Sequence, residues 1–201
     1  MSFVLVFVVC ASSFFSCRVF LMKIISWNCQ GAASSGFRRA LLLLIQKTKA
    51  DLVCLLEPRI SGTAADKACK AFGFDNWIRV EAVGFSGGIW LMWRSNTTVE
   101  IIATNPQFVL TRVSRGEKKL GLISFVYGSP ANYLRKKLWE TLSGDNFPLN
   151  DEWLTMGDYN AVTCMEDVSN PNNFQNHRCA GMRQWVFKEG LIDLGFFGAR
   201  C

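Results

Sequence analysis

A carboxylate and an amide follow an apolar segment between Trp153 and Ala161, which reads WLTMGDYNA. The apolar part is typical of a buried strand, and Asp158 and Asn160 come directly after it. Residues two apart on an extended backbone point to the same side, so we expect Asp158 and Asn160 to project together and Tyr159 to point the other way. Such a pair can orient a water molecule and donate to an anionic oxygen. An ordinary hairpin turn is the alternative, because Gly, Asp and Asn are common turn residues.

Two earlier apolar segments also end in polar side chains. KIISWNCQG (residues 23–31) and DLVCLLEP (51–58) are typical of buried strands, and they carry Asn28 and Glu57 near their ends. Because the ends of adjacent core strands gather at one edge of a sandwich, we expect these side chains to share a pocket with Asp158. Carboxylate and amide oxygens are hard ligands of the kind that Mg²⁺ accepts while it keeps several waters. The alternative is structural, since a buried Asn or Glu often caps a neighbouring loop.

Tyr127 follows a further apolar strand, in the segment FVYGSP. Its phenol group can hydrogen-bond a phosphate oxygen. Taken alone, this residue favours the other interpretation, that of an aromatic side chain at the rim with its hydroxyl in water.

The remaining pattern mixes helices with short strands that contain β-branched and aromatic residues. We expect helices over residues 35–50, 63–74, 131–142 and 177–190, with Gly73 able to end the second of them. Strands are expected over residues 77–82, 87–93, 98–104, 108–114, 120–128 and 152–158, the first five being consecutive and antiparallel and the last buried. This mixture predicts an α+β fold with two packed sheets and helices outside them.

The composition indicates one folded domain with a sizeable core. Of 201 residues, 50% are apolar and 19% are charged, which excludes a disordered chain. The net charge of +6 suits a partner that carries phosphates, although many enzymes with other substrates reach such values. None of the eight cysteines forms a C-x2-C pair, so the pattern argues against a zinc ribbon, and we expect reduced core cysteines in an intracellular protein.

The first 21 residues differ from the rest of the chain. They contain one charged residue, Arg18, and the apolar run over residues 3–11 is short for a transmembrane helix. A secretory signal is the alternative, but no basic segment precedes the run. A well-patterned strand begins at Met22, so we expect Met22 to be the natural start, with an apolar leader over residues 1–21 and one domain over residues 22–201.

Four motifs, in this order, resemble those of the endonuclease/exonuclease/phosphatase superfamily, which has the DNase I-like fold. They are ISWNCQG, LVCLLEPR, VYGSP and TMGDYNAV. GFSGGIWLMW and LIDLGFFG also resemble the endonuclease domain of plant LINE-type (non-LTR) retrotransposons. The similarity extends from about Met22 to the C-terminus. It implies a two-sheet β-sandwich flanked by helices and the in-line hydrolysis of a phosphodiester with Mg²⁺.

The resemblance assigns a role to each candidate residue. Glu57 matches the metal-binding glutamate of the family, and Asn28 matches the asparagine that helps to hold the metal and the phosphate. Tyr127 matches the active-site tyrosine. Asp158 and Asn160 match the pair that positions the water and steadies the transition state.

The sequence departs from the family pattern after LIDLGF, where the family continues with further strands and a Ser-Asp-His segment but this sequence ends at Cys201. Its one histidine, His177, lies at the expected start of a helix and does not match the catalytic histidine. We therefore expect an incomplete domain with an unpaired strand edge and reduced or lost activity. Gln30 stands where some repair nucleases carry an acidic residue, which argues against a second metal site.

The function expected is that of a Mg²⁺-dependent DNA endonuclease fragment derived from a LINE-type retrotransposon, which contacts the phosphate backbone of DNA. One alternative is a non-catalytic nucleic-acid-binding remnant with Trp139 and Trp185 as surface aromatics. Another is a phosphatase or lipid phosphodiesterase of the same superfamily. We expect an intracellular protein, with the nucleus as the compartment that the family suggests, and no stable membrane partner. The sequence does not indicate an oligomeric state.

Overall fold

The computed structural model describes residues 4–11, 20–81, 87–147, 151–163 and 176–195. The chain forms two compact units. The first comprises residues 1–127 and 151–158, and the second comprises residues 128–150 and 159–201.

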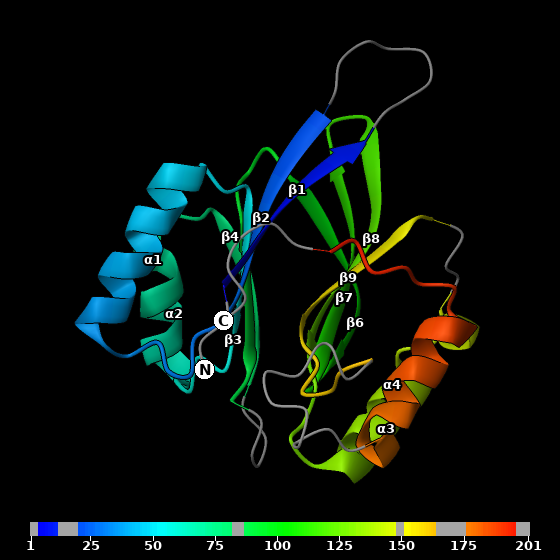
Figure 1. Ribbon diagram of the computed structural model, residues 1–201. Coiled ribbons are helices and arrows are strands. Elements are labelled where there is room, and N and C mark those ends of the chain that lie inside the picture. Colours follow the sequence, from blue (N-terminus) through cyan, green and yellow to red (C-terminus); the bar gives the residue numbers. More distant parts are fainter. Residues whose placement is uncertain (1–3, 12–19, 82–86, 148–150, 164–175, 196–201) are drawn as a thin grey trace. The chain divides into compact units, whose positions relative to one another are not determined.

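The first unit contains a five-stranded sheet in the order β1-β2-β3-β5-β4 (Figure 1). Its strands are β1 (Val4–Ala11), β2 (Phe20–Asn28), β3 (Leu52–Leu56), β4 (Asn76–Val80) and β5 (Ile89–Trp93). Strands β2 and β3 are parallel, and the other neighbouring pairs are antiparallel. The parallel pair matters for the site because the C-terminal ends of β2 and β3 lie at the same edge, with Asn28 opposite Leu56.

The first unit also contains a four-stranded sheet in the order β6-β7-β8-β9. Its strands are β6 (Thr98–Asn105), β7 (Phe108–Arg115), β8 (Lys118–Tyr127) and β9 (Trp153–Asp158). Strand β9 is parallel to β8, and the other pairs are antiparallel. The expectation that β9 is a buried strand is wrong, because β9 forms an edge of the sheet and most of its residues are half-buried.

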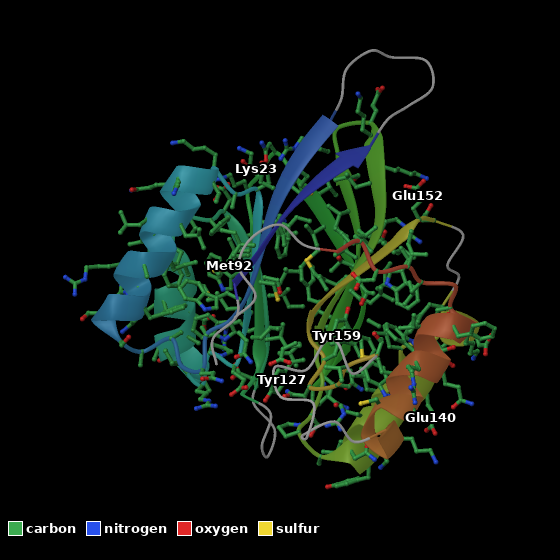
Figure 2. The ribbon with its side chains drawn as sticks, in the orientation of Figure 1. Lys23, Met92, Tyr127, Glu140, Glu152 and Tyr159 are labelled. Atoms are coloured by element: carbon green, nitrogen blue, oxygen red, sulfur yellow. The ribbon has the colours of Figure 1, made fainter. Side chains whose placement is uncertain are left out.

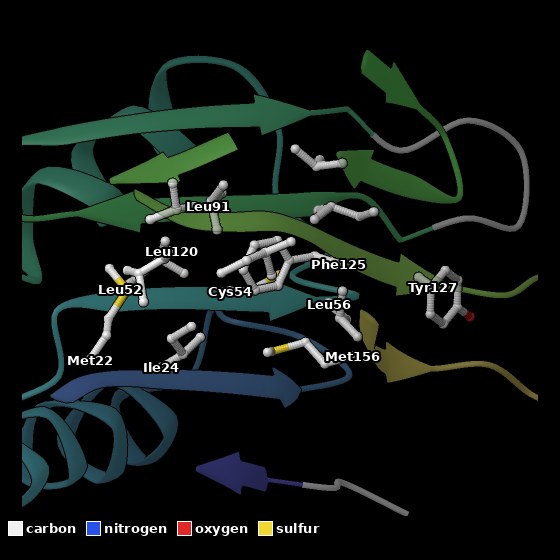
Figure 3. Packing of buried hydrophobic residues seen from close by; sticks show 14 residues of the cluster. Met22, Ile24, Leu52, Cys54, Leu56, Leu91, Leu120, Phe125, Tyr127 and Met156 are labelled. Carbon is white, nitrogen blue, oxygen red and sulfur yellow. The ribbon is translucent and has the colours of Figure 1, made fainter. Parts of the chain in front are cut away.

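The two sheets pack face to face through an apolar core (Figure 3). One face contributes Leu52, Cys54 and Leu91 from the first sheet, and the opposite face contributes Phe125 and Met156 from the second. The other face of the first sheet is covered by helices α1 (Ser35–Thr48) and α2 (Gly62–Ala71) through a second apolar cluster. Both faces of the first sheet are therefore buried, which explains the continuous apolar runs of β2, β3 and β5.

Local sequence signals set the ends of the two helices in the first unit. The Ser34 hydroxyl accepts a hydrogen bond from the Phe37 N–H at 3.1 Å and caps α1, which ends where Lys49 adopts a left-handed conformation. The N–H of Gly73, at φ +74°, donates to the carbonyl of Lys70 just beyond α2. The helices expected over residues 35–50 and 63–74, and the stop at Gly73, are confirmed.

The second unit contains α3 (Asn132–Thr141), a short 3₁₀ helix η1 (Gly144–Asn146) and α4 (Asn176–Lys188). The Trp139 and Trp185 rings stack with their centroids 5.1 Å apart, and the Trp185 indole N–H donates to the carbonyl of Leu142. These side chains are only 8% and 3% exposed, so the expectation that Trp139 and Trp185 are surface aromatics is wrong.

The expected fold class, an α+β sandwich of two sheets with helices, is confirmed, with one correction to the strand pairing. Strands β5 and β6 follow each other along the chain but belong to different sheets, so the five strands from residue 77 to 128 do not form one antiparallel series.

Within the described part of the chain, Cys29, Cys54, Cys69 and Cys179 are free and buried, as expected of reduced core cysteines. No helix there is long and apolar enough to cross a membrane.

Strand β1 lies within the first 21 residues and pairs antiparallel with β2, from Val4 opposite Trp27 to Ala11 opposite Phe20. It gives β2 a hydrogen-bonding partner on the side away from β3, so this side of β2 is not an open edge. The side chains of β1 and the segment over residues 12–19 lie outside the described residues. The status of residues 1–21 as a leader stays a prediction.

A chain that begins at Phe20 should be less stable than the full chain, because its β2 would have an open edge. We expect deletion of residues 1–19 to lower the melting temperature by at least about 5 °C and to promote self-association, measured by thermal unfolding and light scattering. Deletion of residues 1–3, which precede β1, is the matched control and should change neither quantity. Equal melting temperatures for the two deletions would show that β1 contributes nothing to the sheet.

Candidate active site

Four strands of the first unit end beside one another and carry four of the predicted residues there. Asn28 ends β2, Tyr127 ends β8, Asp158 ends β9, and Glu57 is the first residue after β3. Tyr127 and Asp158 are directly opposite each other in the β8–β9 pair. Figure 2 shows Tyr127 at the end of the sandwich opposite to Lys23 and Glu152. The expectation that these strand ends meet at one edge is confirmed.

Asn28 connects the two acidic side chains. Its Nδ2 donates to Asp158 Oδ2 at 2.7 Å and to Glu57 Oε1 at 3.4 Å. Its Oδ1 is buried and has no hydrogen-bond partner. Because a buried carbonyl oxygen without a partner is costly, this atom is a candidate ligand for a cation.

The backbone around Glu57 is not extended. Strand β3 ends at Leu56, and Glu57 has a left-handed conformation with φ +54°, which corrects the expectation that the strand itself ends in Glu57. The carbonyl of Glu57 accepts from the Gly31 N–H at 2.8 Å, and its N–H donates to the carbonyl of Gly88 at 3.1 Å. A Cβ on Gly87 would lie 2.8 Å from Glu57 Cα, so this close approach requires glycine. The turn is therefore held from both sides.

Glu57 is only 7% exposed, and its carboxylate has three side-chain partners. Burial by itself raises the pKa of Glu57, but the hydrogen bond from Tyr127, the hydrogen bonds and charge of Arg59 and the hydrogen bond from Asn28 together outweigh it. The pKa of Glu57 therefore lies below its ordinary value, and the carboxylate is ionised at neutral pH. Arg59 donates through Nε at 3.0 Å to Oε2 and forms a second contact to the same oxygen through Nη2.

Tyr127 is an interior residue and only 2% exposed, so the interpretation of a rim aromatic with its hydroxyl in water is wrong. Its ring closes one end of the apolar core, with the hydroxyl directed away from Phe125 and Met156 (Figure 3). Burial, the hydrogen bond to Glu57 and the negative charges of Glu57 and Asp158 all raise the pKa of Tyr127. The hydroxyl therefore keeps its proton and acts as a donor at all ordinary pH values.

Asp158 depends on the glycine before it. Gly157 has φ +143°, and a Cβ at this position would lie 2.0 Å from the carbonyl oxygen of Val126 in β8. Any other residue would push β9 away from β8 and move Asp158 from its place beside Tyr127. The glycine in WLTMGDYNA is thus explained by strand contact rather than by a turn.

Asn160 does not follow the strand geometry expected from the sequence. Strand β9 ends at Asp158, and Asn160 has a left-handed conformation with φ +46°, so the expectation of an extended backbone through Asn160 is wrong. Asn160 belongs to the second unit, where its Nδ2 donates to the carbonyl of Gly128 at 2.8 Å. There the Tyr159 ring packs against Trp139 and Trp185.

Two further residues were singled out from the sequence, His177 and Gln30. His177 is the second residue of α4, which confirms its place at a helix start, and its side chain lies outside the described residues. Gln30 is exposed and has a left-handed conformation with φ +50°.

Comparison with known proteins agrees with this geometry. A family model described as the endonuclease/exonuclease/phosphatase family matches residues 25–199. The chain belongs to this family. No curated protein sequence matches it. Members of the family are hydrolytic nucleases and phosphodiesterases, and divalent-metal dependence is general among them.

Solved structures share the fold at low sequence identity. An AP endonuclease from Leishmania major superposes with a TM-score of 0.60 at 14% identity, over 84% of this chain and 66% of that one. An AP endonuclease from Archaeoglobus fulgidus superposes with a TM-score of 0.57 at 13% identity, over 83% of this chain and 69% of that one. The catalytic domain of APE2 from Xenopus laevis superposes with a TM-score of 0.56 at 19% identity, over 83% of this chain and 67% of that one. The chain thus spans about two thirds of the length of these proteins.

The residues present fit the divalent ion that is general in the family. The ionised Glu57 carboxylate and the buried Oδ1 of Asn28, which has no partner, are both hard oxygen donors. Within the described ranges, no three His, Cys, Asp or Glu side chains form a group that could hold a metal ion. An ion here would therefore rely on few protein ligands and keep several waters, as Mg²⁺ does.

Sequence reasoning missed two residues of the site, Arg59 and Gly87. Arg59 was part of the motif LVCLLEPR, and its position two residues from a buried glutamate was a signal for an ion pair. Gly87 was part of GFSGGIWLMW, but the close approach to Glu57 joins segments 30 residues apart and had no local signal.

Replacing Gly157 with alanine should disturb the β8–β9 pair because its Cβ would overlap the Val126 carbonyl. We expect Gly157→Ala to lower the free energy of unfolding by at least about 2 kcal/mol, measured by urea denaturation. Gly36→Ala in α1, where a Cβ would meet open space, is the control and should leave stability unchanged or raise it by up to about 1 kcal/mol. Equal losses in both variants would contradict the role given to Gly157.

Tyr127→Phe should destabilise the protein in a pH-dependent way. Because the folded-state pKa of Glu57 lies below its ordinary value, its stabilising contribution is present above that value and is lost as pH falls through the folded-state pKa. We expect Tyr127→Phe to cost about 1.5–3 kcal/mol at pH 7 and clearly less at an acidic pH at which Glu57 is protonated in the folded state, measured by urea unfolding at both pH values. Tyr133→Phe, at an exposed tyrosine of α3, should cost nothing at either pH. A Tyr127→Phe cost that does not change with pH would rule out this link to Glu57.

Proposed function

We propose that this chain carries a Mg²⁺-dependent phosphodiesterase site that cleaves DNA as an endonuclease. The observation that carries the proposal is the Asn28 amide, which bonds both Asp158 and Glu57 while its own oxygen stays buried without a partner. A structural asparagine would normally satisfy that oxygen with a donor. Here the buried oxygen and the ionised carboxylate are better explained as parts of a cation site.

The proposed roles follow from the environment of each side chain. Glu57 and Asn28 Oδ1 would hold the ion, and Tyr127 keeps Glu57 ionised and fixes its orientation by a hydrogen bond. When bound there, Mg²⁺ would neutralise charge that develops on the phosphate. Asp158, oriented by Asn28, would hold the attacking water and accept its proton. The role of Asn160 as a donor to a phosphate oxygen rests on the resemblance of GDYN to the family motif.

DNA is the substrate that the charge and the relatives support. The net charge of +6 attracts a polyanion, and two of the proteins with the same fold are AP endonucleases. An origin in a LINE-type retrotransposon is part of the proposal and rests on the resemblance of GFSGGIWLMW and LIDLGFFG to such domains. Phosphatase or lipid phosphodiesterase activity would use the same strand-end residues and is therefore an outcome that the test must separate.

The proposal is tested by the nicking of supercoiled plasmid DNA by purified residues 1–201 in Mg²⁺ and in EDTA. We expect nicking in Mg²⁺, none in EDTA, and a loss of at least about 100-fold in Glu57→Gln and Asp158→Ala, since both side chains act at the reacting phosphate. Glu100→Gln, which removes an exposed carboxylate of β6 paired with Arg112, should nick like the wild type.

Three results would contradict the proposal in different ways. Nicking that survives in Glu57→Gln and Asp158→Ala would show that these residues are not catalytic. Turnover of an inositol phosphate or of sphingomyelin without nicking would give a different substrate class. Salt-sensitive DNA binding by a folded protein that does not nick would indicate a non-catalytic binding protein.

A further inference from the structure

We propose that Arg59 is a built-in counter-ion that competes with the divalent cation for Glu57 and so sets the ion concentration at which the site fills. This inference rests on the proposed function, because it takes Glu57 to be a metal ligand. The inference adds that Arg59, two residues from Glu57, competes with the ion for the Glu57 carboxylate.

Arg59 occupies one particular oxygen of the Glu57 carboxylate. Both of its contacts, from Nε at 3.0 Å and from Nη2, go to Oε2, whereas Asn28 donates to Oε1. A guanidinium that donates twice to a carboxylate forms a strong, charge-assisted contact. An ion that approached Glu57 at Oε2 would therefore have to displace Arg59.

The backbone places Arg59 in this position. Glu57 and Arg59 both have left-handed conformations, at φ +54° and φ +53°, on either side of Pro58. The N–H of Arg59 donates to the carbonyl of Gly87 at 3.0 Å, next to the Glu57–Gly88 hydrogen bond. Two left-handed non-glycine residues separated by a single residue are costly and persist only where surrounding contacts fix them. The Arg59–Glu57 pair is thus part of a braced turn and not a chance contact between surface side chains.

The two partners differ in their access to water. The Arg59 side chain is 56% exposed, whereas the Glu57 side chain is 9% exposed. A displaced Arg59 guanidinium would therefore be hydrated, while Glu57 is fixed by Tyr127 and Asn28. When the ion pair opens, Arg59 is therefore the side chain that moves away, and Glu57 stays in place. A doubly charged ion gains more from Glu57 than a guanidinium does, so exchange is favoured once the ion is concentrated enough.

The test is the affinity for Mn²⁺, a substitute for Mg²⁺, measured by isothermal titration calorimetry without DNA. We expect Arg59→Gln to bind Mn²⁺ about three to ten times more tightly than the wild type, because a competing charge is removed. Arg59→Lys keeps the charge and should stay within about threefold of the wild type. The rise in melting temperature caused by Mn²⁺ should likewise be larger in Arg59→Gln than in the wild type.

Arg112→Gln is the matched control. Arg112 is also paired with carboxylates, Glu100 and Asp151, but it faces Leu122 in the β7–β8 pair, about 16 Å along β8 from Tyr127. Its loss removes the same charge from the protein and should leave the Mn²⁺ affinity unchanged.

A second measurement follows Arg59 in the wild-type protein and therefore does not depend on a charge-changing variant that folds. The Nε–H NMR signal of Arg59 is assigned in the wild type as the signal that is lost in Arg59→Lys. This signal should shift when the metal-free wild type is titrated with Mg²⁺.

The outcomes separate this inference from the proposed function. If Glu57→Gln abolishes ion binding but Arg59→Gln binds no more tightly than the wild type, the competition is overturned and the metal site stands. Weaker binding by Arg59→Gln would likewise overturn it, because Arg59 would then support the site. If Glu57→Gln binds the ion like the wild type, the metal site at Glu57 and the competition both fail. If Arg59→Gln and Arg112→Gln both bind the ion more tightly than the wild type, the change in net charge explains the effect, and the competition at Glu57 is overturned.

Discussion

A carboxylate with little access to water must be balanced by its neighbours, and this requirement governs the end of the sandwich around Glu57. Three side chains balance it: the phenol of Tyr127, the guanidinium of Arg59 and the amide of Asn28. Each comes from a different place in the chain, so the first unit must be folded before the charge is fully compensated. The same balance leaves Glu57 ionised and Tyr127 protonated, which is the state that binding a cation and a phosphate requires.

The sheets turn this electrostatic requirement into a fixed geometry. Strands β2 and β3 are parallel, as are β8 and β9, and the Asn28–Asp158 hydrogen bond shows that the two pairs end on the same side of the apolar core. Two glycines permit the contacts that the charges need: Gly157 lets β9 lie against β8, and Gly87 lets its loop touch Glu57. Backbone contact therefore holds the acidic groups in place, and side chains only complete the arrangement.

The sequence was sufficient for features that depend on local pattern. Apolar runs ending in polar residues predicted the strands and the meeting of Asn28, Glu57 and Asp158, because both follow from strand periodicity. It was insufficient where distant contacts decide the conformation. The left-handed turns at Glu57 and Asn160 and the burial of Trp139 and Trp185 depend on neighbours far along the chain. Exposure in particular cannot be read from a tryptophan alone, since an aromatic stripe suits either a surface or a core.

The spacing of these residues along the chain also sets the order in which the site can form during synthesis. Arg59 leaves the ribosome within a fraction of a second of Glu57, but Tyr127 follows 70 residues later, about 4–14 s at ordinary elongation rates. Asp158, which is 130 residues from its partner Asn28, comes later still. Until then, Arg59 is the partner that the nascent chain can offer to Glu57 from the same turn. The local partner of Glu57 is thus synthesised with it, whereas its full compensation waits for the long-range pairing of β8 and β9.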